Sequence, residues 1–480
     1  MSSRRSGRAP NKAAPAPPKP AAVAQTKKSR AKQPPRKRQK ISEETPLNTA
    51  PSSVLSVFVF GSGENGELGL GPRHTASTRP RLNPFLDAKD PNALHVVRLA
   101  CGGMHTVALT ADNRLVTWGV NDNDALGRRT DWDDGLRDVD DESGSDDAEL
   151  NPHESTPKEV SSETIPDGTR FVDVAAGDSC SFALTDMGFV YGWGTFRDPE
   201  GNERFGYSPS GVLIKRQPVP ILVPGLSRIT QIVCGANHAL ALDAAGTIWA
   251  WGSGRQNQFG RHLFGRHQES LKPRPVPVCR GGARLIGSGE YHCFAVGRRK
   301  DDVWGWGLNS FGQAGDPDTA GGDSALLPYP VKIKALSGRG VTVLAGGAHH
   351  SAAVAADGQV YAWGRMDGGQ LGVKFTEEQL GDEEAVRRDE RDKPRICLQP
   401  TPVPQLGEAV HVACGTDHTI FVAKDGGAWA TGFGSEGQLG LGSDDDVDAV
   451  QRIQGKAVKD WKLTWAGAGG QFSSLAAAVV

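Results

Sequence analysis

The sequence predicts an all-β fold, a propeller of seven four-stranded blades, and three observations support this fold class. A pattern of G-x-x-H, a strand, a turn and W-G recurs along the chain in nearly fixed phase. The spacing between its two glycines is always 17 or 18 residues, whereas the linkers between copies vary, as expected for like units joined by tolerant loops. The two ends of the chain each carry half of a further copy. The first glycines are Gly102, Gly177, Gly235, Gly289, Gly346 and Gly415, and the second glycines are Gly119, Gly194, Gly252, Gly307, Gly364 and Gly432.

Residues 1–53 precede the repeats and are rich in Pro, Ala, Ser, Lys and Arg without apolar periodicity, which predicts a disordered tail. The first 40 residues contain 13 Lys or Arg and no acidic residue. Removing these 13 from the 54 basic residues leaves 41 against 56 acidic ones, a net charge of about -15 for the remainder. The cluster Arg36, Lys37, Arg38 and Lys40 is typical of a nuclear import signal, so we expect a nuclear import receptor as a partner. The same cations could contact nucleic acid phosphates, and a purely solubilising tail is the alternative.

The half copies at the two ends fit together. Val57–Gly61 supplies a W-G type strand with no G-x-x-H strand before it, and Trp465–Phe472 supplies the missing type with nothing after it. Pairing of the N- and C-terminal strands would complete a seventh blade and close residues 54–480 into a ring, which removes the exposed edges of an open array.

Within each copy the alternation of apolar and polar residues is that of strands. Met104–Thr110 and Arg114–Trp118 interleave the two kinds of residue on either side of a short turn. Later copies place glycine in this turn, as at Gly246, Gly358 and Gly426. We therefore expect antiparallel hairpins that form the inner strands of each blade.

Histidine and tryptophan recur at fixed positions of the pattern. A metal site would need three or four ligands around one ion, but each histidine belongs to a different blade, so we expect no metal and a hydrogen bond from each histidine to the backbone of its own blade. The tryptophans that precede the W-G glycine are expected to pack between adjacent blades. The histidines are His105, His238, His292, His349 and His418, and the tryptophans are Trp118, Trp193, Trp251, Trp306 and Trp363.

Two insertions interrupt the rhythm between copies. Residues 131–149 form an acidic run that could shield the basic tail, bind a basic partner or simply be solvated, and residues 376–395 mix both signs of charge. Seven cysteines lack C-x-x-C spacing, and we find neither a secretory signal nor an apolar stretch of membrane length. We expect reduced cysteines, an intracellular protein and no membrane contact. Since the chain carries no P-loop, catalytic triad order or zinc-protease helix, we also expect no cofactor and no covalent catalysis.

One copy departs from the others after its W-G turn. Elsewhere a further glycine follows eight residues after the W-G glycine, but from Gly194 to Gly206 the gap is twelve. The surplus falls in residues 195–205, where Asp198-Pro199-Glu200-Gly201 has the residue order of a type I turn. We expect a short charged hairpin that projects from the disc and contacts a partner; a neutral loop insertion is the alternative.

Together, the motifs C-G-x-x-H-T, W-G-x-N-x-x-G-x-L-G and the elongated W-G-T-F-R-D-x-x-G turn make the chain resemble the regulator of chromosome condensation family, the guanine-nucleotide exchange factors for the GTPase Ran. The resemblance covers about residues 54–480, and the acidic insertion is more similar to fungal members. It implies a propeller that binds Ran on one face and chromatin, through histones and DNA, on the other. It further implies a nuclear protein of nucleocytoplasmic transport and mitosis, which we expect to be monomeric.

The resemblance also assigns residues. The long turn corresponds to a wedge that contacts Ran, over Phe196, Arg197, Asp198, Pro199, Glu200 and Gly201 and on to Phe205. Asp178 matches an aspartate of the Ran-binding face, Glu64 is a further candidate there, and Asn237 stands where an aspartate is expected. Gly312 and Phe472 stand where animal members carry histidines. Arg261 and Arg266 correspond to a loop that contacts the nucleosome.

Two other classes of protein use such a ring. One is an adaptor or chromatin-binding scaffold without exchange activity, which a negative exchange assay would favour. The other is an ultraviolet photoreceptor, which needs a tryptophan cluster with arginines across a dimer. Here five of the eleven tryptophans occupy the packing position, and we find no G-W-R-H-T run.

Overall fold

The computed structural model describes residues 45–132, 149–198, 200–208, 210–261, 270–322 and 325–479. Thr45–Val480 forms one compact unit. This unit begins before residue 54, the expected start of the propeller, because the backbone N–H groups of Leu47 and Asn48 both donate to the carbonyl of Asp186. The Asn48 side chain also donates to the carbonyl of Ile229 at 2.8 Å, in the next blade. Among the described residues, no helix has the length and apolar character needed to cross a membrane.

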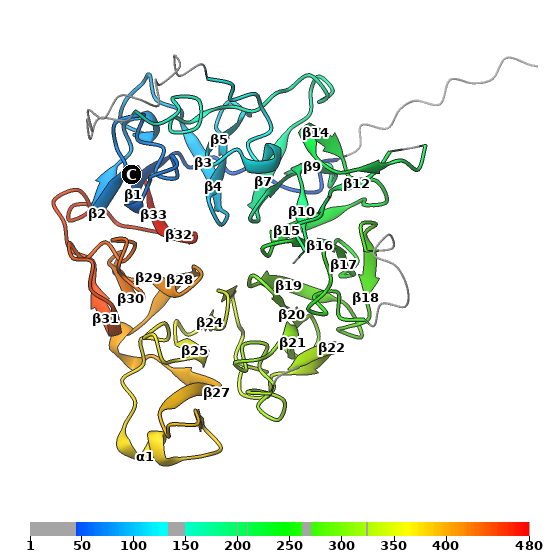
Figure 1. Ribbon diagram of the computed structural model, residues 1–480. Helices are drawn as coiled ribbons and strands as arrows, with labels where there is room; N and C mark the ends of the chain where they lie inside the picture. Colours follow the sequence, from blue (N-terminus) through cyan, green and yellow to red (C-terminus); the bar gives the residue numbers. More distant parts are fainter. Residues whose placement is uncertain are drawn as a thin grey trace, which may run out of the picture. The chain divides into compact units, whose positions relative to one another are not determined.

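Seven antiparallel sheets follow one another around a ring, as predicted (Figure 1). Six have four strands, as predicted. The remaining sheet has a fifth strand, β26, which the prediction of four strands in each blade did not include. The closing blade contains β2 (Ala76–Leu82), β1 (Leu55–Ser62), β33 (Phe472–Ala478) and β32 (Trp465–Ala468). The next three contain β3 (Val96–Cys101), β4 (His105–Thr110), β5 (Leu115–Gly119) and β6 (Lys158–Glu159); β7 (Phe171–Ala176), β8 (Cys180–Thr185), β9 (Val190–Gly194) and β14 (Gln217–Leu222); and β15 (Ile229–Cys234), β16 (His238–Asp243), β17 (Ile248–Gly252) and β18 (Arg274–Val276). The last three contain β19 (Ala283–Ser288), β20 (His292–Gly297), β21 (Val303–Leu308) and β22 (Leu326–Lys332); β23 (Val343–Gly346), β24 (His350–Val354), β25 (Val360–Arg365), β27 (Pro394–Pro402) and β26 (Val386–Arg388); and β28 (Ala409–Cys414), β29 (His418–Ala423), β30 (Ala428–Gly432) and β31 (Val447–Arg452).

The ring closes by pairing of the two ends of the propeller. β1 and β33 are antiparallel neighbours from Leu55 opposite Ala478 to Gly61 opposite Phe472. In Figure 1 the blue β1 lies beside the red β33 in one blade. The predicted composite blade is therefore confirmed, and Phe472 occupies the place that histidine has in most blades.

The loops between first and second strands all lie at one face of the ring, together with the turns that follow the third strands; we call this the glycine-loop face. Its loops are joined by a belt of backbone hydrogen bonds of 2.8–3.3 Å that returns to its starting point. The bonds run from N–H to carbonyl as Gly103 to Gly177, Asp178 to Ala236, Ala236 to Glu290, Glu290 to Gly347, Ala348 to Thr416, Thr416 to Gly469 and Gly470 to Gly103. The opposite end of the strands carries the short turns between second and third strands, and we call it the hairpin-turn face.

Two glycine positions of the motif are required by close approach. A Cβ atom on Gly235 would lie 2.1 Å from Cε1 of His238, so the imidazole ring can pack there only over glycine. Gly119 has a φ of +101°, and its Cβ would lie 2.4 Å from the carbonyl oxygen of Met104. The W-G glycine thus combines a backbone conformation that other residues disfavour with contact against the neighbouring strand.

The repeated tryptophans pack between adjacent blades, as predicted, and all five are at most 2% exposed. Four of them also donate from Nε1 to a carbonyl in the loop of the preceding blade. These bonds join Trp118 to Glu67 (3.1 Å), Trp193 to Ala125 (2.8 Å), Trp306 to Gln258 (2.7 Å) and Trp363 to Gln313 (3.0 Å).

The side chains of the repeated histidines form hydrogen bonds to the neighbouring blade. The predicted hydrogen bond from each histidine to the backbone of its own blade was therefore wrong. Each Nε2 contacts a hydroxyl or thiol on the second strand of the next blade. That group donates in turn to a loop carbonyl, as Ser351 does to Gln313 at 2.9 Å. Because a carbonyl only accepts and Ser351 has one proton, Nε2 of His292 must be the donor to Ser351. The pairs are His105 with Ser181, His238 with Cys293, His292 with Ser351, His350 with Thr419 and His418 with Ser473, at 2.7–3.0 Å.

The sixth blade uses His350 rather than His349 at this position, which corrects the predicted phase. Two adjacent glycines and two adjacent histidines fit the pattern in either frame. Pairing of His350 with Gly364 and the bond from Gly347 N–H to the His350 carbonyl select the second frame. His349 is instead half-buried, with its ring centroid 4.8 Å from that of Phe311.

The remaining short elements belong to loops. The charged insertion at residues 376–395 contains α1 (Glu377–Gly381), which begins with a capping box at Thr376, and β26. Short 3-10 turns occur at Pro84–Leu86, Asp122–Asp124 and Pro404–Leu406. Most of the acidic insertion lies outside the described residues, but at its end Glu149 pairs with Arg73 at 2.8 Å.

Replacing one hydroxyl of the histidine network should destabilise the ring. Ser351→Ala leaves Nε2 of His292 buried without its acceptor, so we expect the free energy of unfolding to fall by about 1–3 kcal/mol. The exposed Ser162→Ala serves as the control and should change it by less than about 0.5 kcal/mol. Urea denaturation measures both; equal effects would contradict a role of the network in stability.

Stability should also fall as the solution becomes acidic. Burial lowers the pKa of His105 and His350 to about 4 and that of His238 and His418 to about 3. Below pH 6.5 the unfolded chain binds protons that these folded histidines exclude, so stability is lost as the pH falls, at up to about 1.4 kcal/mol per pH unit and histidine. Urea midpoints should change little from pH 7.5 to about pH 6.5 and decrease from there to pH 5. A constant midpoint would show that these histidines are not buried in the neutral form.

Candidate functional site

The long turn after β9 forms a two-stranded hairpin, as predicted. β10 (Phe196–Arg197) pairs with β11 (Glu203–Arg204), and we call these strands with their turn the insertion hairpin. At its tip, Oδ1 of Asp198 accepts hydrogen bonds from the N–H groups of Glu200 and Asn202 at 3.1 and 2.8 Å. Gly201 closes the turn with a φ of +77°. The tip is thus held by its own residues.

Ion pairs surround the tip. Partial burial acts to raise the pKa of Asp198, but hydrogen bonds from Asn202 and the charges of Arg204 and Arg255 outweigh it and lower that pKa. Arg255, from the next blade, also pairs with Glu200 at 2.5 Å. The hairpin is therefore tied to the neighbouring blade by charge as well as by packing.

The root of the insertion hairpin is a buried aromatic stack. Phe196 lies parallel to Phe205 and Phe182, with ring centroids 6.1 Å apart in both pairs. Trp251 of the next blade meets Phe182 edge to face at 5.5 Å. Phe196 and Trp251 are both 2% exposed. Rigid apolar contacts thus fix the direction in which the hairpin leaves the ring.

Asn237 supports the hairpin from the loop of the next blade. Its Oδ1 accepts from the backbone N–H of Arg197 at 2.6 Å. The resemblance predicted an aspartate at this position, and an amide oxygen supplies the same acceptor without the charge.

The departure from the repeat is larger than four residues, which corrects the sequence-based interpretation. Gly206 does not take the place of the spaced glycine of other copies, because it begins a second hairpin of β12 (Gly206–Tyr207) with β13 (Leu213–Ile214). Only at Gln217 does the chain return to pair with Gly194 of β9. Arg216 binds Glu203 through two contacts of 2.6 Å and links the two hairpins.

Acidic groups gather where the belt surrounds the ring axis. Burial raises the pKa of Asp178, and the nearby Arg197 opposes this shift. Burial, together with the charge of Asp178, raises the pKa of Glu290 to about 7, and Thr416 donates to Glu290 at 2.7 Å. Two carboxyl groups from different blades therefore face one region beside the insertion hairpin.

Glu290 and Thr416 were missed in the sequence, although a signal existed. Both follow the first glycine of their copies, as Asp178 does. At this position other copies have a small residue, namely Gly103, Ala236 or Ala348. Asp178 and Glu290 are therefore unusual among the copies, and this difference was visible in the sequence.

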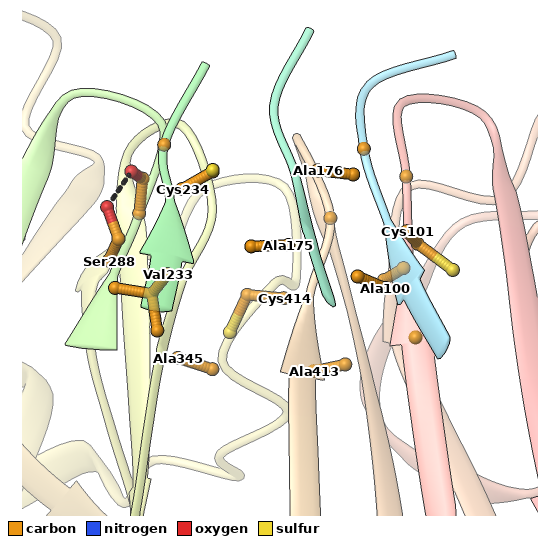
Figure 2. Close-up of a pocket in the computed structure, with 18 of the residues that line it drawn as sticks. Ala100, Cys101, Ala175, Ala176, Val233, Cys234, Ser288, Ala345, Ala413 and Cys414 are labelled. Atoms are coloured by element: carbon orange, nitrogen blue, oxygen red, sulfur yellow. Dashed lines mark hydrogen bonds between the residues drawn. The ribbon is translucent and has the colours of Figure 1, made fainter. Parts of the chain in front are cut away.

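A channel of about 320 Å³ runs along the axis below these carboxyl groups. Its wall comes from the first strand of every blade and consists mostly of small side chains, among them Ala100, Ala175 and Ala345 (Figure 2). Cys101, Cys234 and Cys414 also line it, and they are free thiols, as predicted. The described residues contain no group of three or more His, Cys, Asp or Glu side chains placed to hold a metal ion.

Other predicted positions are distributed as follows. Glu64 is exposed in the turn after β1, on the glycine-loop face. Arg261 is half-buried, with its guanidinium 5.2 Å from the ring centroid of Phe259. It follows β17, which ends at the same face as β9, so the expectation of opposite faces for the two partner sites does not hold for Arg261. The reason is that both loops join a third strand to a fourth.

Two departures from the animal pattern are explained by local packing. Phe472 is 1% exposed and packs over Gly469, whose Cβ would lie 2.2 Å from its ring. Gly312 has a φ of +71° in the turn after β21. The predicted positions Pro199, Arg266, Arg36, Lys37, Arg38 and Lys40 lie outside the described residues.

Comparisons with known proteins agree on one family. The model of the RCC1-like domain matches residues 56–475. The chain is 38% identical over 431 residues to the guanine nucleotide exchange factor SRM1 of Saccharomyces cerevisiae, covering 87% of this chain and 86% of that protein. It is similar to Prp20p of the same yeast, whose crystal structure was described with its binding properties to Gsp1p and histones, at 36% identity, 91% and 93% coverage and a TM-score of 0.78. It is also similar to yeast RCC1 (Prp20) in a structure bound to Kap60, at 34% identity, 94% and 97% coverage and a TM-score of 0.79.

Removing the carboxylate at the tip should loosen the insertion hairpin without unfolding the ring. In Asp198→Ala the N–H groups of Glu200 and Asn202 lose their acceptor, so we expect faster amide hydrogen exchange in residues 200–204. Asp198→Asn keeps an oxygen acceptor and should stay closer to wild type. The exposed Asp357→Ala, in the turn after β24, is a control for general effects and should leave these amides unchanged. Equal protection in Asp198→Ala and wild type would contradict the role of Asp198.

Proposed function

The chain belongs to the family of proteins built on the RCC1-like domain, and from this premise we propose that it is a guanine-nucleotide exchange factor for a Ran-type GTPase. The observation that carries the proposal is the insertion hairpin. It leaves the glycine-loop face, it is rooted in a buried aromatic stack, and it lies beside the carboxyl group of Asp178, which in turn acts on Glu290.

The proposed activity forms and breaks no covalent bond in the protein. A nucleotide bound to its GTPase with picomolar affinity has roughly 16 kcal/mol of binding free energy, so it leaves slowly by itself. The insertion hairpin contacts the GTPase beside the nucleotide and displaces the elements that bind phosphate and Mg²⁺. Contacts to the propeller compensate for those that are lost. By linkage, the exchange factor and the nucleotide weaken each other's binding by the same factor.

Each part of the site has a separate task in this proposal. Arg197, Asp198, Glu200 and Gly201, with the neighbouring Pro199, present the contact surface at the tip. Phe196 and Asn237 hold its root. Asp178 contacts the GTPase from the loop between β7 and β8 of the same blade, and Glu64 contacts it from the closing blade. Because the factor favours the nucleotide-free GTPase, the relative concentrations of GDP and GTP set the direction of exchange.

We also propose that the protein acts in the nucleus on chromatin. Yeast Prp20p provides the support, since its binding to histones and its complex with Kap60 were both described. Arg36, Lys37, Arg38 and Lys40 bind the import receptor, and the basic tail with Arg261 and Arg266 contacts nucleosomal DNA and histones. Arg261, which is half-buried with its guanidinium over Phe259, serves this contact from the same face as the hairpin.

Release of a fluorescent GDP from Ran tests the exchange activity. Deletion of residues 199–202 removes the tip, and Asp178→Ala removes a carboxylate beside it, so we expect each to slow catalysed release by about tenfold or more, equivalent to about 1.4 kcal/mol. Glu163→Ala removes an exposed carboxylate between β6 and β7 and should exchange at the wild-type rate. Wild-type rates in both site variants would refute the site. Binding of Ran without accelerated release by the wild-type protein would indicate an adaptor instead.

A further inference from the structure

A second surface lies away from the insertion hairpin, between the blade of β28–β31 and the closing blade. Here the outer strand β2 and the connection from β31 to β32 enclose a groove of about 1170 Å³, which we call the rim groove. It opens at the outer edge of the ring towards the hairpin-turn face, since its lining includes the turn between β29 and β30. Ligand pockets in proteins usually enclose about 300–1,000 Å³, so the groove has room for a segment of chain.

The rim groove is positively charged on a body that is negatively charged. Its lining contains five cations, Arg79, Arg81, Arg452, Lys456 and Lys459, and one carboxylate, Asp425, a formal balance of +4. Residues 41–480 together carry about -15. Such a local reversal of sign attracts an anionic partner.

These cations are only partly neutralised from within. Arg452 pairs with Asp425 at 3.2 Å, and Lys459 lies 3.9 Å from Asp460. Arg81 and Lys456 are exposed and make no ion pair among the described residues. Two charges are therefore available to a ligand.

The floor of the groove is apolar. Val458 and Leu463 are buried there, and Leu82 and Trp461 are half-buried, so part of their surface remains open to the groove. An ion with its water shell would leave this surface exposed, whereas apolar side chains of a ligand would cover it.

The chemistry of the floor also argues against nucleic acid. Binding of single strands relies on open aromatic faces on which bases stack. Nζ of Lys89 lies 4.2 Å over the ring of Trp461, and Phe58 contacts the same ring edge to face at 5.5 Å. A duplex presents phosphates and no apolar group that would enter the groove.

We propose that the rim groove binds an extended polypeptide segment in which acidic and apolar side chains alternate. Successive side chains of an extended chain point to opposite sides, so one row contacts the floor and the other contacts the cations. The surface belongs to other blades than the insertion hairpin, and such a partner can bind while the exchange site is occupied.

Fluorescence anisotropy with a labelled peptide of alternating glutamate and leucine tests the proposal on the full chain. Arg81→Glu with Lys456→Glu should weaken binding by about tenfold or more at low salt. Arg299→Glu with Lys300→Glu makes the same charge change in exposed residues of the turn after β20 and should leave affinity and GDP exchange unchanged. Equal loss in both double variants would overturn the proposal.

Two further probes separate the alternatives. A peptide with glycine in place of leucine should bind about tenfold more weakly, and equal binding would refute the role of the floor. Photo-leucine in the first peptide should cross-link to residues 77–82 and 453–463, and cross-links elsewhere would refute the site. Tighter binding of single- or double-stranded DNA with the same dependence on Arg81 and Lys456 would overturn the choice of a polypeptide.

Discussion

Each blade of this protein is stabilised by contacts with its two neighbours, and these contacts continue around the whole ring. The belt of backbone hydrogen bonds joins the loops between the first and second strands of all seven blades and returns from Gly470 to Gly103. Beneath it, a loop carbonyl such as that of Gln313 receives both the Trp363 indole and the Ser351 hydroxyl of the next blade. The motif residues thus act at blade boundaries rather than inside blades. A ring leaves no terminal blade with an unmatched boundary, which is why the chain completes its last sheet with its first strand.

One boundary is built differently, and it is the one that carries the insertion hairpin. Between β9 and β14 the chain makes two hairpins in place of the loop that accepts hydrogen bonds elsewhere. There the tryptophan of the next blade, Trp251, meets the ring of Phe182, and Phe196 and Phe205 extend the stack. At this boundary aromatic packing replaces the hydrogen bonds that a loop accepts elsewhere. The segment between β9 and β14 is therefore not needed for those bonds and can extend from the ring as a hairpin. The structural exception and the proposed functional element have the same origin.

Much of this could be predicted from the sequence because the repeat encodes it. Constant glycine spacing fixed the number of blades, and the half copies around Val57 and Phe472 predicted closure. Two kinds of detail could not be predicted. Where two frames fit equally, as at His349 and His350, only strand pairing with Gly364 decides between them. The partner of each histidine depends on how adjacent blades are rotated relative to each other. The spacing of residues within one copy gives no information about that rotation.

The site shows the same division. The tip of the hairpin was predictable because Asp and Gly have strong turn preferences. The second hairpin was not, because Gly206 happened to imitate the glycine of the repeat at a slightly longer spacing. The pKa of Glu290 depends on how the blades pack together, which the sequence does not show. Burial and the approach of Asp178 from a different blade together raise this pKa to about 7.

Rigidity is what the scaffold contributes to exchange. A flexible loop inserted into a partner must first be ordered, at about 1–2 kcal/mol of conformational entropy per residue. The insertion hairpin is already ordered in the free protein by its aromatic root, by the Asp198 turn and by the bond from Arg197 to Asn237. The free energy of contact with a GTPase can therefore be applied to displacing nucleotide rather than to folding the hairpin. A propeller suits this use because the closed belt of hydrogen bonds joins the blade that carries the hairpin to both neighbouring blades. Displacement of the tip is therefore resisted by the whole ring.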